Sequence, residues 1–467
     1  MALDWQSGGV KNAAIFEDRL DQWMNRLEEQ AVNLHGFCLV HRGAVVAERY
    51  FAPFHAESPH RMYSVGKSLT SIGVGLLEAD GLVSLDDPVY SYFPEACPPD
   101  LHPYIRKMTV RDLLEMRTAH ASTTYKRTDD SWVASFFHTA PDHIPGTIFS
   151  YDTSGSHVLS ALIEKRTGME LMAYLQARAL RPLALSEGCH FLKDPDGVSQ
   201  GGSGLVCTLR DIAKIGWLMT CGGVWDGQQL LPSEYVRRAT SKQVSTCFLP
   251  KPDERNGYGW QIWQVRNNGF AFYGLAGQWC ICLPEQQLIL TTTADTHANP
   301  AGEHAICQAF WDILYPCFAE STNGKLSSPR ARQVLAVCGE RTVPQASMAE
   351  GTRYRMEANA MKLEAFRLLR DASGGSVELS LDGHTYIIEF GVGQVREGSV
   401  QGASCLASGA WVDDNTFCMR VNQIGDELRE MVLVAFFCED EATVMLRQYG
   451  EYSPRYPQGF ASGRREA

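Results

Sequence analysis

The sequence predicts an α+β domain followed by a smaller all-β domain. Within the first 320 residues, helical spacing of apolar residues dominates the middle, and strand-like runs stand near both ends. Beyond a polar, turn-rich stretch at 319–350, short runs alternate apolar and polar residues, with turn residues between them. We therefore expect domains at 1–320 and 351–467, joined by a linker at 321–350.

Helices are expected where apolar residues of the first domain recur every three or four positions. The helix that begins at Ser64 should end near Gly81, a suitable C-terminal cap. Thr109 and Asp112 resemble a capping box at the start of another helix. Further helices are predicted over 16–31, 108–120, 154–168, 205–223 and 303–318.

Strands are expected on either side of these helices. Two β-rich runs around Arg42-Gly43 predict a hairpin. Three antiparallel strands are predicted over 258–265, 270–284 and 286–295. The second domain should be an antiparallel sandwich or barrel, built from the runs at 376–383, 384–391, 415–425, 429–440 and 441–450.

The charge balance and the cysteines restrict partners and compartment. The chain has 42 basic against 54 acidic residues, a net charge of −12, and no long basic run. Nucleic acid and anionic membranes are therefore not expected as partners. No apolar stretch predicts a transmembrane helix, and the first residues lack the pattern of a signal peptide. Fourteen cysteines without a C-x-x-C or a Cys/His ligand spacing favour a cytoplasmic protein without metal or cofactor.

Ser64 and Lys67 stand three residues apart at the front of a predicted helix, among apolar residues and glycines. Residues i and i+3 share a helix face, with Cβ atoms roughly 5–6 Å apart. The positive end of the helix dipole and partial burial both favour the neutral amine of Lys67. A neutral amine can take the proton of a serine hydroxyl, which activates the serine without a histidine. Ser-x-x-Lys also arises by chance in a chain of this length. Whether this pair is catalytic therefore depends on the surrounding sequence.

The surrounding sequence resembles one enzyme superfamily over about Leu34 to Phe318. Five segments occur in the matching order: "YSVGKSLTSIGVGLLEADGLVSLDDPVYSYFPE", "MTVRDLLEMRTAH", "PGTIFSYDTSGSHVLSALIEKRTGMELMAYLQARALRPLAL", "GGSGLVCTLRDIAKIGWLMTCGGVWDGQQLLP" and "YGWQIW" with "YGLAGQWCICLPEQQLILTTTAD". They resemble the serine β-lactamase and penicillin-binding-protein superfamily, in its class C β-lactamase and esterase-like branch. The resemblance implies a β-lactamase-like catalytic domain, an antiparallel sheet flanked by helices with a helical subdomain. The C-terminal domain resembles the lipocalin-like modules appended to some members of this branch.

The resemblance implies roles for residues at the matching positions. Ser64 aligns with the serine that is acylated, and Lys67 aligns with its general base. Tyr151 aligns with a tyrosine that relays a proton between the serine and the leaving group. Thr153 stands where the superfamily has an asparagine. Its hydroxyl can still donate a hydrogen bond, but it replaces the side-chain amide only in part.

The third motif of the superfamily, usually Lys-Thr-Gly, aligns with Leu275-Ala276-Gly277, which we expect at the substrate site. The backbone N–H groups of Ser64 and Gln278 are expected to form the oxyanion hole. In lactam-handling relatives the lysine and threonine help to hold a substrate carboxylate. Their loss weakens the expectation of a β-lactam substrate, but an oxyanion hole made of main chain does not require them.

Other residues near these motifs are expected to be structural. Core packing explains most of the aromatic side chains around the third motif, and one or two of them could line a cleft: Tyr258, Trp260, Trp263, Tyr273 and Trp279. Cys280 and Cys282 should lie buried on one face of a strand. None of the histidines nearest the motifs is expected to be catalytic: His120, His138, His143 and His157. Motifs of α/β-hydrolases, zinc proteases and nucleotide-binding proteins do not occur.

The sequence therefore predicts a serine hydrolase that acts through an acyl-enzyme. Its substrate would be a small ester, an amide or a D-amino-acid peptide. Two alternatives stay open: a non-catalytic scaffold or binding protein on the same fold, and a true β-lactamase. The sequence predicts neither the oligomeric state nor the role of the C-terminal domain.

Overall fold

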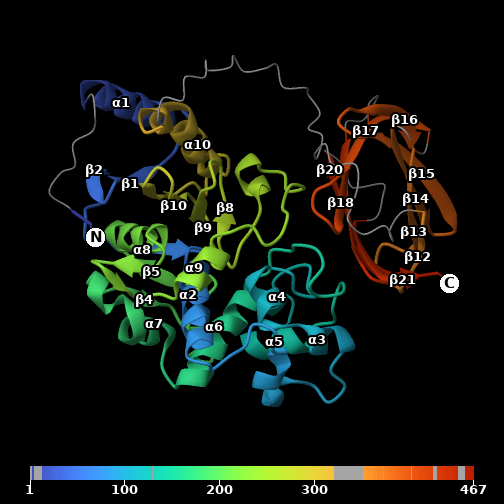
Figure 1. Ribbon diagram of the computed structural model, residues 1–467, viewed down its shortest axis with the longest axis horizontal. Coiled ribbons are helices and arrows are strands. Elements are labelled where there is room, and N and C mark those ends of the chain that lie inside the picture. The colour runs from blue at the N-terminus through green and yellow to red at the C-terminus, as the bar shows by residue number, and fades with distance from the viewer. Residues whose placement is uncertain are drawn as a thin grey trace.

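A computed structural model of the 467-residue chain shows an α+β domain and a β-barrel (Figure 1). It describes residues 3–4, 13–128, 130–319, 351–371, 373–400, 402–423, 429–450 and 458–466. The linker predicted at 321–350 lies outside the described residues. No helix in these ranges is both long and apolar enough to cross a membrane.

The first domain is built around an antiparallel sheet with the strand order β2-β1-β11-β10-β9-β8. Its strands are β1 (Leu34–His41), β2 (Ala44–Tyr50), β8 (Trp263–Gln264), β9 (Phe270–Gly274), β10 (Gln278–Leu283) and β11 (Leu288–Ala294). The predicted first hairpin is present, and Arg42 and Gly43 adopt positive φ angles of 52° and 81° at its turn. Because β1 pairs with β11, strands from the two ends of this domain meet in one sheet.

Side-chain alternation along the strands divides the apolar residues between two cores. Phe37 of β1 packs with α1 (Ala13–Glu29) and α10 (Gly302–Ala309), whereas Cys38 packs with α8 (Leu209–Thr220) and the central helices. Figure 1 shows α1 and α10 on one face of the sheet and α8 on the other.

Cys280 and Cys282 are buried on the α8 face of β10, which confirms their predicted packing role. Their Sγ atoms lie 3.7 Å apart. A Cβ on Gly216 of α8 would lie 2.4 Å from the Cys280 Sγ, so the absence of a side chain there lets the helix approach the strand.

A helical region surrounds α2 (Gly66–Ala79) and α6 (Thr153–Thr167), which pack against each other. Its other helices are α3 (Pro103–Lys107), α4 (Val110–Leu114), α5 (Trp132–His138), α7 (Leu171–Leu175) and α9 (Ser233–Ala239). Five short strands form two further small sheets, β3-β5-β4 and β6-β7. They are β3 (His60–Tyr63), β4 (His190–Phe191), β5 (Leu205–Cys207), β6 (Val224–Trp225) and β7 (Gln228–Gln229).

Two helices are shorter than predicted. The helix expected over 108–120 has its predicted capping box but ends at Leu114, because Met116 adopts a left-handed φ of 56°. The segment 205–223 begins as strand β5, and α8 starts only after a second capping box, formed by Thr208 and Asp211.

The strand predicted over 270–284 is instead a hairpin. Ala276 and Gly277, with φ angles of 66° and 93°, turn the chain between β9 and β10. Apolar residues continue through the turn, so the sequence pattern of the hairpin looks like that of one long strand. The strand predicted over 258–265 is reduced to β8.

The C-terminal domain is an antiparallel barrel. Its strands follow the order β15-β14-β13-β12-β21-β20-β19-β18-β17-β16, and an additional pairing of β15 with β17 closes it. Apolar side chains such as Phe366, Leu433 and Val444 fill its interior. The strands are β12 (Arg353–Met356), β13 (Leu363–Arg370), β14 (Gly374–Leu381), β15 (His384–Gly391), β16 (Arg396–Val400), β17 (Ala403–Trp411), β18 (Thr416–Gln423), β19 (Arg429–Cys438), β20 (Glu441–Gly450) and β21 (Gly459–Arg465).

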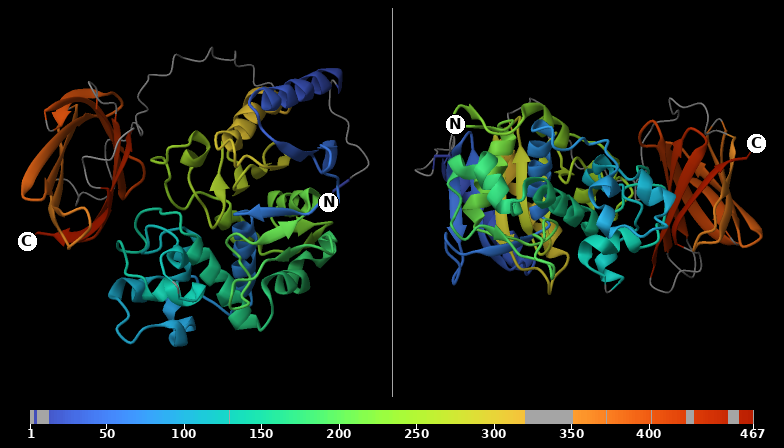
Figure 2. Two further views of the ribbon diagram at one scale, coloured as in Figure 1. Left: turned by 180° about the vertical axis from the view of Figure 1, so that it is seen from behind. Right: turned by 90° about the horizontal axis from the view of Figure 1, so that it is seen from below.

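The barrel packs on the first domain through a shared buried cluster. Phe248 and Trp263 of the first domain belong to it, and so do Val432 and Met445 of the barrel. The ring of His143 stacks on that of Phe460, with centroids 4.2 Å apart. Figures 1 and 2 show the wall around β18 and β20 turned toward the loops of the first domain. The barrel is therefore placed to contribute side chains to a site in the first domain.

Candidate active site

Ser64 lies in a tight turn between β3 and α2. Tyr63, the last residue of β3, has a left-handed φ of 47°, and α2 begins two residues after the serine. The backbone N–H of Lys67 donates to the carbonyl of Ser64 at 3.1 Å. Ser64 therefore stands just before the helix rather than in its first turn, and Lys67 still reaches it.

Lys67 is almost fully buried, and its side-chain nitrogen meets three oxygens. Nζ lies 3.0 Å from Ser64 Oγ, 3.2 Å from Thr153 Oγ1 and 2.6 Å from the carbonyl oxygen of Gly202. A Cβ on Gly202 would lie 2.6 Å from Thr153 Cγ2, so the close approach needs glycine.

The charged form of Lys67 is destabilised at this position. Burial lowers the pKa of Lys67 to about 7, with Asp152 opposing the shift and Lys126 adding to it. A large fraction of the molecules therefore carries a neutral amine beside Ser64 near neutral pH.

Tyr151 approaches the same serine from the segment before α6. Lys67 Nζ lies 4.9 Å from the centre of the Tyr151 ring, and the Trp263 ring stacks on Tyr151 with centroids 5.8 Å apart. Burial raises the pKa of Tyr151 well above its usual value, although a hydrogen bond with Ser64 partly offsets the rise. The phenol therefore stays protonated at ordinary pH while it contacts the serine hydroxyl.

Asp152 holds the segment that carries Tyr151 and Thr153. It caps α6: its carboxylate accepts from Ser154 N at 2.8 Å and from Thr118 Oγ1 at 3.0 Å. Burial raises the pKa of Asp152 to about 6, and the hydrogen bonds from Ser154 and Thr118 oppose that rise. The structure thus brings Ser64, Lys67, Tyr151 and Thr153 together, as the sequence predicts.

Ser64 and Tyr151 line a cavity of about 310 Å³. Part of its wall is aromatic, with Phe149, Trp263 and Tyr273 among the lining residues. The charged residues of the wall are Lys251, Glu254, Glu303 and Arg447. A concave surface that combines aromatic side chains with a few polar groups is typical of small-molecule sites.

Arg447 reaches the cavity from β20 of the barrel. Met445, two residues earlier, packs in the cluster between the domains, so alternation places Arg447 on the same side of the strand. Among the residues that the structure describes, the guanidinium has no hydrogen-bond or ion-pair partner. The barrel therefore adds a positive charge to the wall of the cavity that contains Ser64.

The β9–β10 turn sends only one of its predicted site residues into the cavity. Leu275 lines the cavity and is 51% exposed, whereas Ala276 and Gln278 are buried outside the lining, and Gly277 is not part of it either. A Cβ on Gly274 would lie 2.2 Å from the carbonyl oxygen of Met62. The end of β9, and not the start of β10, therefore runs against the backbone that leads to Ser64.

The side chain of Gln278 is buried in the sheet and lies outside the cavity lining. Its side-chain amide donates to the carbonyl oxygens of Leu275 at 3.2 Å, Ala276 at 3.3 Å and Ala294 at 2.6 Å. Gln278 thus stabilises the turn from within the sheet. The role predicted for its backbone N–H in the oxyanion hole stays a prediction.

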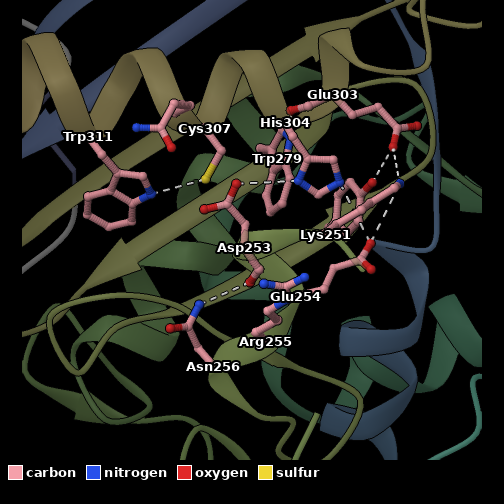
Figure 3. A network of polar contacts seen from close by, with 12 residues as sticks. Lys251, Asp253, Glu254, Arg255, Asn256, Trp279, Glu303, His304, Cys307 and Trp311 are labelled. Atoms are coloured by element: carbon pink, nitrogen blue, oxygen red, sulfur yellow. Dashed lines mark hydrogen bonds and ion pairs between the residues drawn. The ribbon is translucent and has the colours of Figure 1, made fainter. Parts of the chain in front are cut away.

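A charged network joins the cavity wall to α10 (Figure 3). Lys251 Nζ lies 3.2 Å from the Glu303 carboxylate and 3.7 Å from that of Glu254, and His304 lies 3.4 Å from Asp253. Burial raises the pKa of Glu254 against the opposing charge of Lys251. Sequence reasoning missed this wall, since its residues come from separate segments that share no motif.

The other sequence candidates lie outside the cavity lining, except for Trp263 and Tyr273. His157 is buried with its Nε2 2.9 Å from Asp194. His120 bonds the carbonyl oxygen of Phe136 at 2.9 Å, and His138 lies 3.3 Å from Asp130. These contacts support the predicted structural roles.

One group of potential metal ligands lies elsewhere in the described part of the chain. Ligand atoms of Cys189, Cys207 and Asp211 lie within 4.8 Å of one another. The carboxylate of Asp211 already accepts from Ser186 N at 2.9 Å and from Thr208 N at 3.0 Å. These oxygens cap α8 and do not form an open ligand set.

The beta-lactamase family profile matches residues 20–306, more than half of the chain. The chain belongs to the beta-lactamase family. It is similar to the 6-aminohexanoate-dimer hydrolase of Paenarthrobacter ureafaciens, with 28% identity over 278 residues, 53% of this chain and 70% of the relative.

Solved structures share the fold of this beta-lactamase family member over nearly its whole length. SurE, in its structure with D-Leu, gives a TM-score of 0.55 at 19% identity and covers 97% of this chain and 100% of its own. The octameric penicillin-binding protein homologue from Pyrococcus abyssi gives 0.52 at 15% identity, with coverage of 96% and 99%. These likenesses show the fold alone.

Proposed function

We propose that this protein hydrolyses an amide or ester through an acyl-enzyme on Ser64. The observation that carries the proposal is the buried Lys67 amine, 3.0 Å from Ser64 Oγ. The pKa of Lys67, lowered to about 7 by burial, makes that amine a base at neutral pH.

The contacts of Lys67 match the needs of a neutral amine. Such an amine has two N–H bonds and one lone pair. In the neutral form, the carbonyl of Gly202 and the hydroxyl of Thr153 would accept the two N–H bonds, which would leave the lone pair for the Ser64 hydroxyl. As Ser64 Oγ attacks the substrate carbonyl carbon, its proton passes to Lys67 and the carbonyl oxygen becomes negative.

We place the second oxyanion donor at the backbone N–H of Leu275 instead of Gln278, with the N–H of Ser64 as the first. Leu275 lines the cavity at the end of β9, where that strand lies against the chain leading to Ser64. Backbone donors at this position would stabilise the tetrahedral intermediate.

Tyr151 completes the proton transfers. When the bond from carbonyl carbon to nitrogen or oxygen breaks, the phenol gives its proton to the leaving group and regains one from Lys67. Water then attacks the acyl carbon and gives its proton to Lys67. Ser64 Oγ leaves with a proton and the carboxylic acid product is released.

Arg447 supports a substrate that carries a carboxylate. A guanidinium pairs well with a carboxylate, and this one has no partner within the described residues. It offers the positive charge that the third motif lacks. The dimer named for the Paenarthrobacter relative is a linear amide that ends in a carboxylate, and we propose amides of this kind as substrates.

Replacing Arg447 by alanine should raise KM for a carboxylate-bearing amide by about 10- to 100-fold, since hydrogen bonds to charged groups contribute about 1.5–3 kcal/mol. The 6-aminohexanoate dimer and its C-terminal amide are suitable paired substrates, because only the first should respond. Arg464→Ala is the control, since Arg464 pairs with Glu441 at 3.2 Å outside the cavity. An equal loss for both substrates would contradict a carboxylate contact.

The rate should rise with pH through the pKa of Lys67. The neutral amine is the active form, and its pKa is about 7, so kcat/KM for a neutral ester should reach half its plateau near that pH. Tyr151 stays protonated over this range because burial raises its pKa. Initial rates between about pH 5 and 9.5 measure the profile. An acid limb near the ordinary carboxyl pKa of about 4 would point to a different base.

The two alternatives predict different outcomes from one screen. Esters, amides and D-amino-acid peptides are tested against wild-type protein and Ser64→Ala. A scaffold protein turns over none of them. A true β-lactamase would hydrolyse nitrocefin faster than all of these substrates, whereas we expect amides or esters to be preferred.

A further inference from the structure

Glu303 carries a buried carboxylate that none of the proposed chemical steps uses. It lies in the first turn of α10 and is 4% exposed. Its oxygens accept from the backbone N–H of Ala276 at 2.7 Å, from the hydroxyl of Tyr273 and from Lys251 at 3.2 Å. Figure 3 shows the Glu303 side chain directed from α10 toward Lys251. Glu303 therefore connects α10 to the turn between β9 and β10.

The turn that Glu303 contacts is strained. Ala276 has a φ of 66°, a conformation that a residue with a Cβ rarely adopts unless its surroundings hold it. The neighbouring Leu275 is half exposed at the cavity, so packing alone does not hold it. Gln278 binds the carbonyl oxygens of this turn, and Glu303 binds its N–H group at Ala276.

The charge of Glu303 is maintained in spite of its burial. Burial alone would raise the pKa of Glu303, but hydrogen bonds from Tyr273 and Ala276 and the charge of Lys251 outweigh it and leave that pKa lowered. The bond to Ala276 therefore stays charge-assisted at working pH, and such bonds are stronger than neutral ones.

We propose that Glu303 is a positioning residue, which holds the β9–β10 turn so that the N–H of Leu275 faces the oxyanion. The inference rests on the function proposed above. Leu275 precedes Ala276, whose N–H is bound by Glu303. Gly274, the residue before Leu275, lies against the backbone that leads to Ser64. A turn released from α10 would move the Leu275 donor relative to Ser64 Oγ.

Two conservative variants separate the bond to Ala276 from the charge. Glu303→Asp keeps the charge but is one methylene too short for the 2.7 Å bond. Glu303→Gln keeps the reach and an accepting oxygen but loses the charge. Glu115→Asp and Glu115→Gln are matched controls, because Glu115 is also buried, binds Trp260 Nε1 at 3.3 Å and lies outside the cavity lining.

Each variant is assayed for kcat, for KM and for inhibition by a boronic acid, whose adduct places a negative oxygen in the oxyanion hole. Glu303→Asp should lower kcat by about 10- to 100-fold, no more than the removal of one oxyanion-hole donor would. KM should change by less than about threefold. The boronic acid should bind more weakly by a similar factor. Glu303→Gln should stay within about fivefold of wild type in all three quantities.

The reverse order, with Glu303→Gln impaired and Glu303→Asp active, would overturn the inference, and so would normal boronic acid binding by Glu303→Asp. If Glu303 had a purely structural role, the Asp variant would have a lower melting temperature, but kcat would not fall while KM stays nearly unchanged. Ser64→Ala is assayed alongside: turnover that survives it refutes the proposed function itself. Turnover that needs Ser64 but not the Glu303 bond refutes only the present inference.

Discussion

Replacing Lys67 by arginine is expected to lower kcat/KM by about 10²–10⁴-fold, the usual contribution of a general base. A guanidinium stays protonated far above neutral pH, so it cannot take the proton of Ser64. It is also larger, while Nζ of Lys67 already lies 2.6 Å from the carbonyl oxygen of Gly202. Steady-state hydrolysis of a nitrophenyl ester, followed across the pH range, measures the loss.

The matched control is Lys165→Arg, because Lys165 lies on the surface and pairs with Glu95. It should behave as wild type. If Lys67→Arg kept more than about a tenth of wild-type kcat/KM, the amine of Lys67 would not be the base, since no neutral form is available to the guanidinium.

Replacing Ser64 by alanine is expected to reduce turnover of every substrate by about 10⁴-fold or more, because the proposed mechanism forms the acyl-enzyme on Ser64. The fold should remain, since Ser64 lies in the turn before α2 and its hydroxyl borders the cavity. Turnover measured at substrate concentrations well above KM, together with a thermal melt, separates loss of chemistry from loss of structure.

Ser68→Ala is the control for this variant. Ser68 is one turn further along, fully buried in α2, and its hydroxyl donates to the carbonyl oxygen of Gln261 at 2.9 Å. Its replacement should cost about 1 kcal/mol of stability and leave kcat near wild type. Equal residual activity in the two variants would remove Ser64 from the mechanism.

The first two motifs could be predicted because their residues are close in sequence. Ser64 and Lys67 are three residues apart at the turn into α2, and Tyr151 and Thr153 flank the cap residue of α6. Local geometry therefore brings each pair to the correct position once α2 and α6 pack together. The two domains were also predictable, since their periodicities differ.

The third motif could not be placed from its sequence pattern. Apolar residues run through β9, the turn and β10, so the pattern of two short strands matches that of one long strand. Gly277 offers a turn signal, but the bend also needs a left-handed φ at Ala276, a residue type that gives no such signal. The oxyanion role predicted for the backbone N–H of Gln278 stays a prediction, and we propose Leu275 in its place because Leu275 lines the cavity.

The charged part of the cavity was also beyond sequence reasoning. Arg447 belongs to a different domain from Ser64, and it meets the cavity only because β20 packs on the first domain. Glu303 follows the sheet strands and is brought back to the β9–β10 turn by α10. Such contacts depend on the tertiary packing of elements far apart in the chain.

The most direct test is the mass of the protein after treatment with a fluorophosphonate probe, followed by peptide mapping. We expect one added phosphonyl group on Ser64, formed faster as pH rises through the pKa of Lys67, about 7, and absent in Ser64→Ala. Labelling of another residue, or a folded protein that hydrolyses esters while Ser64 stays unmodified, would contradict it.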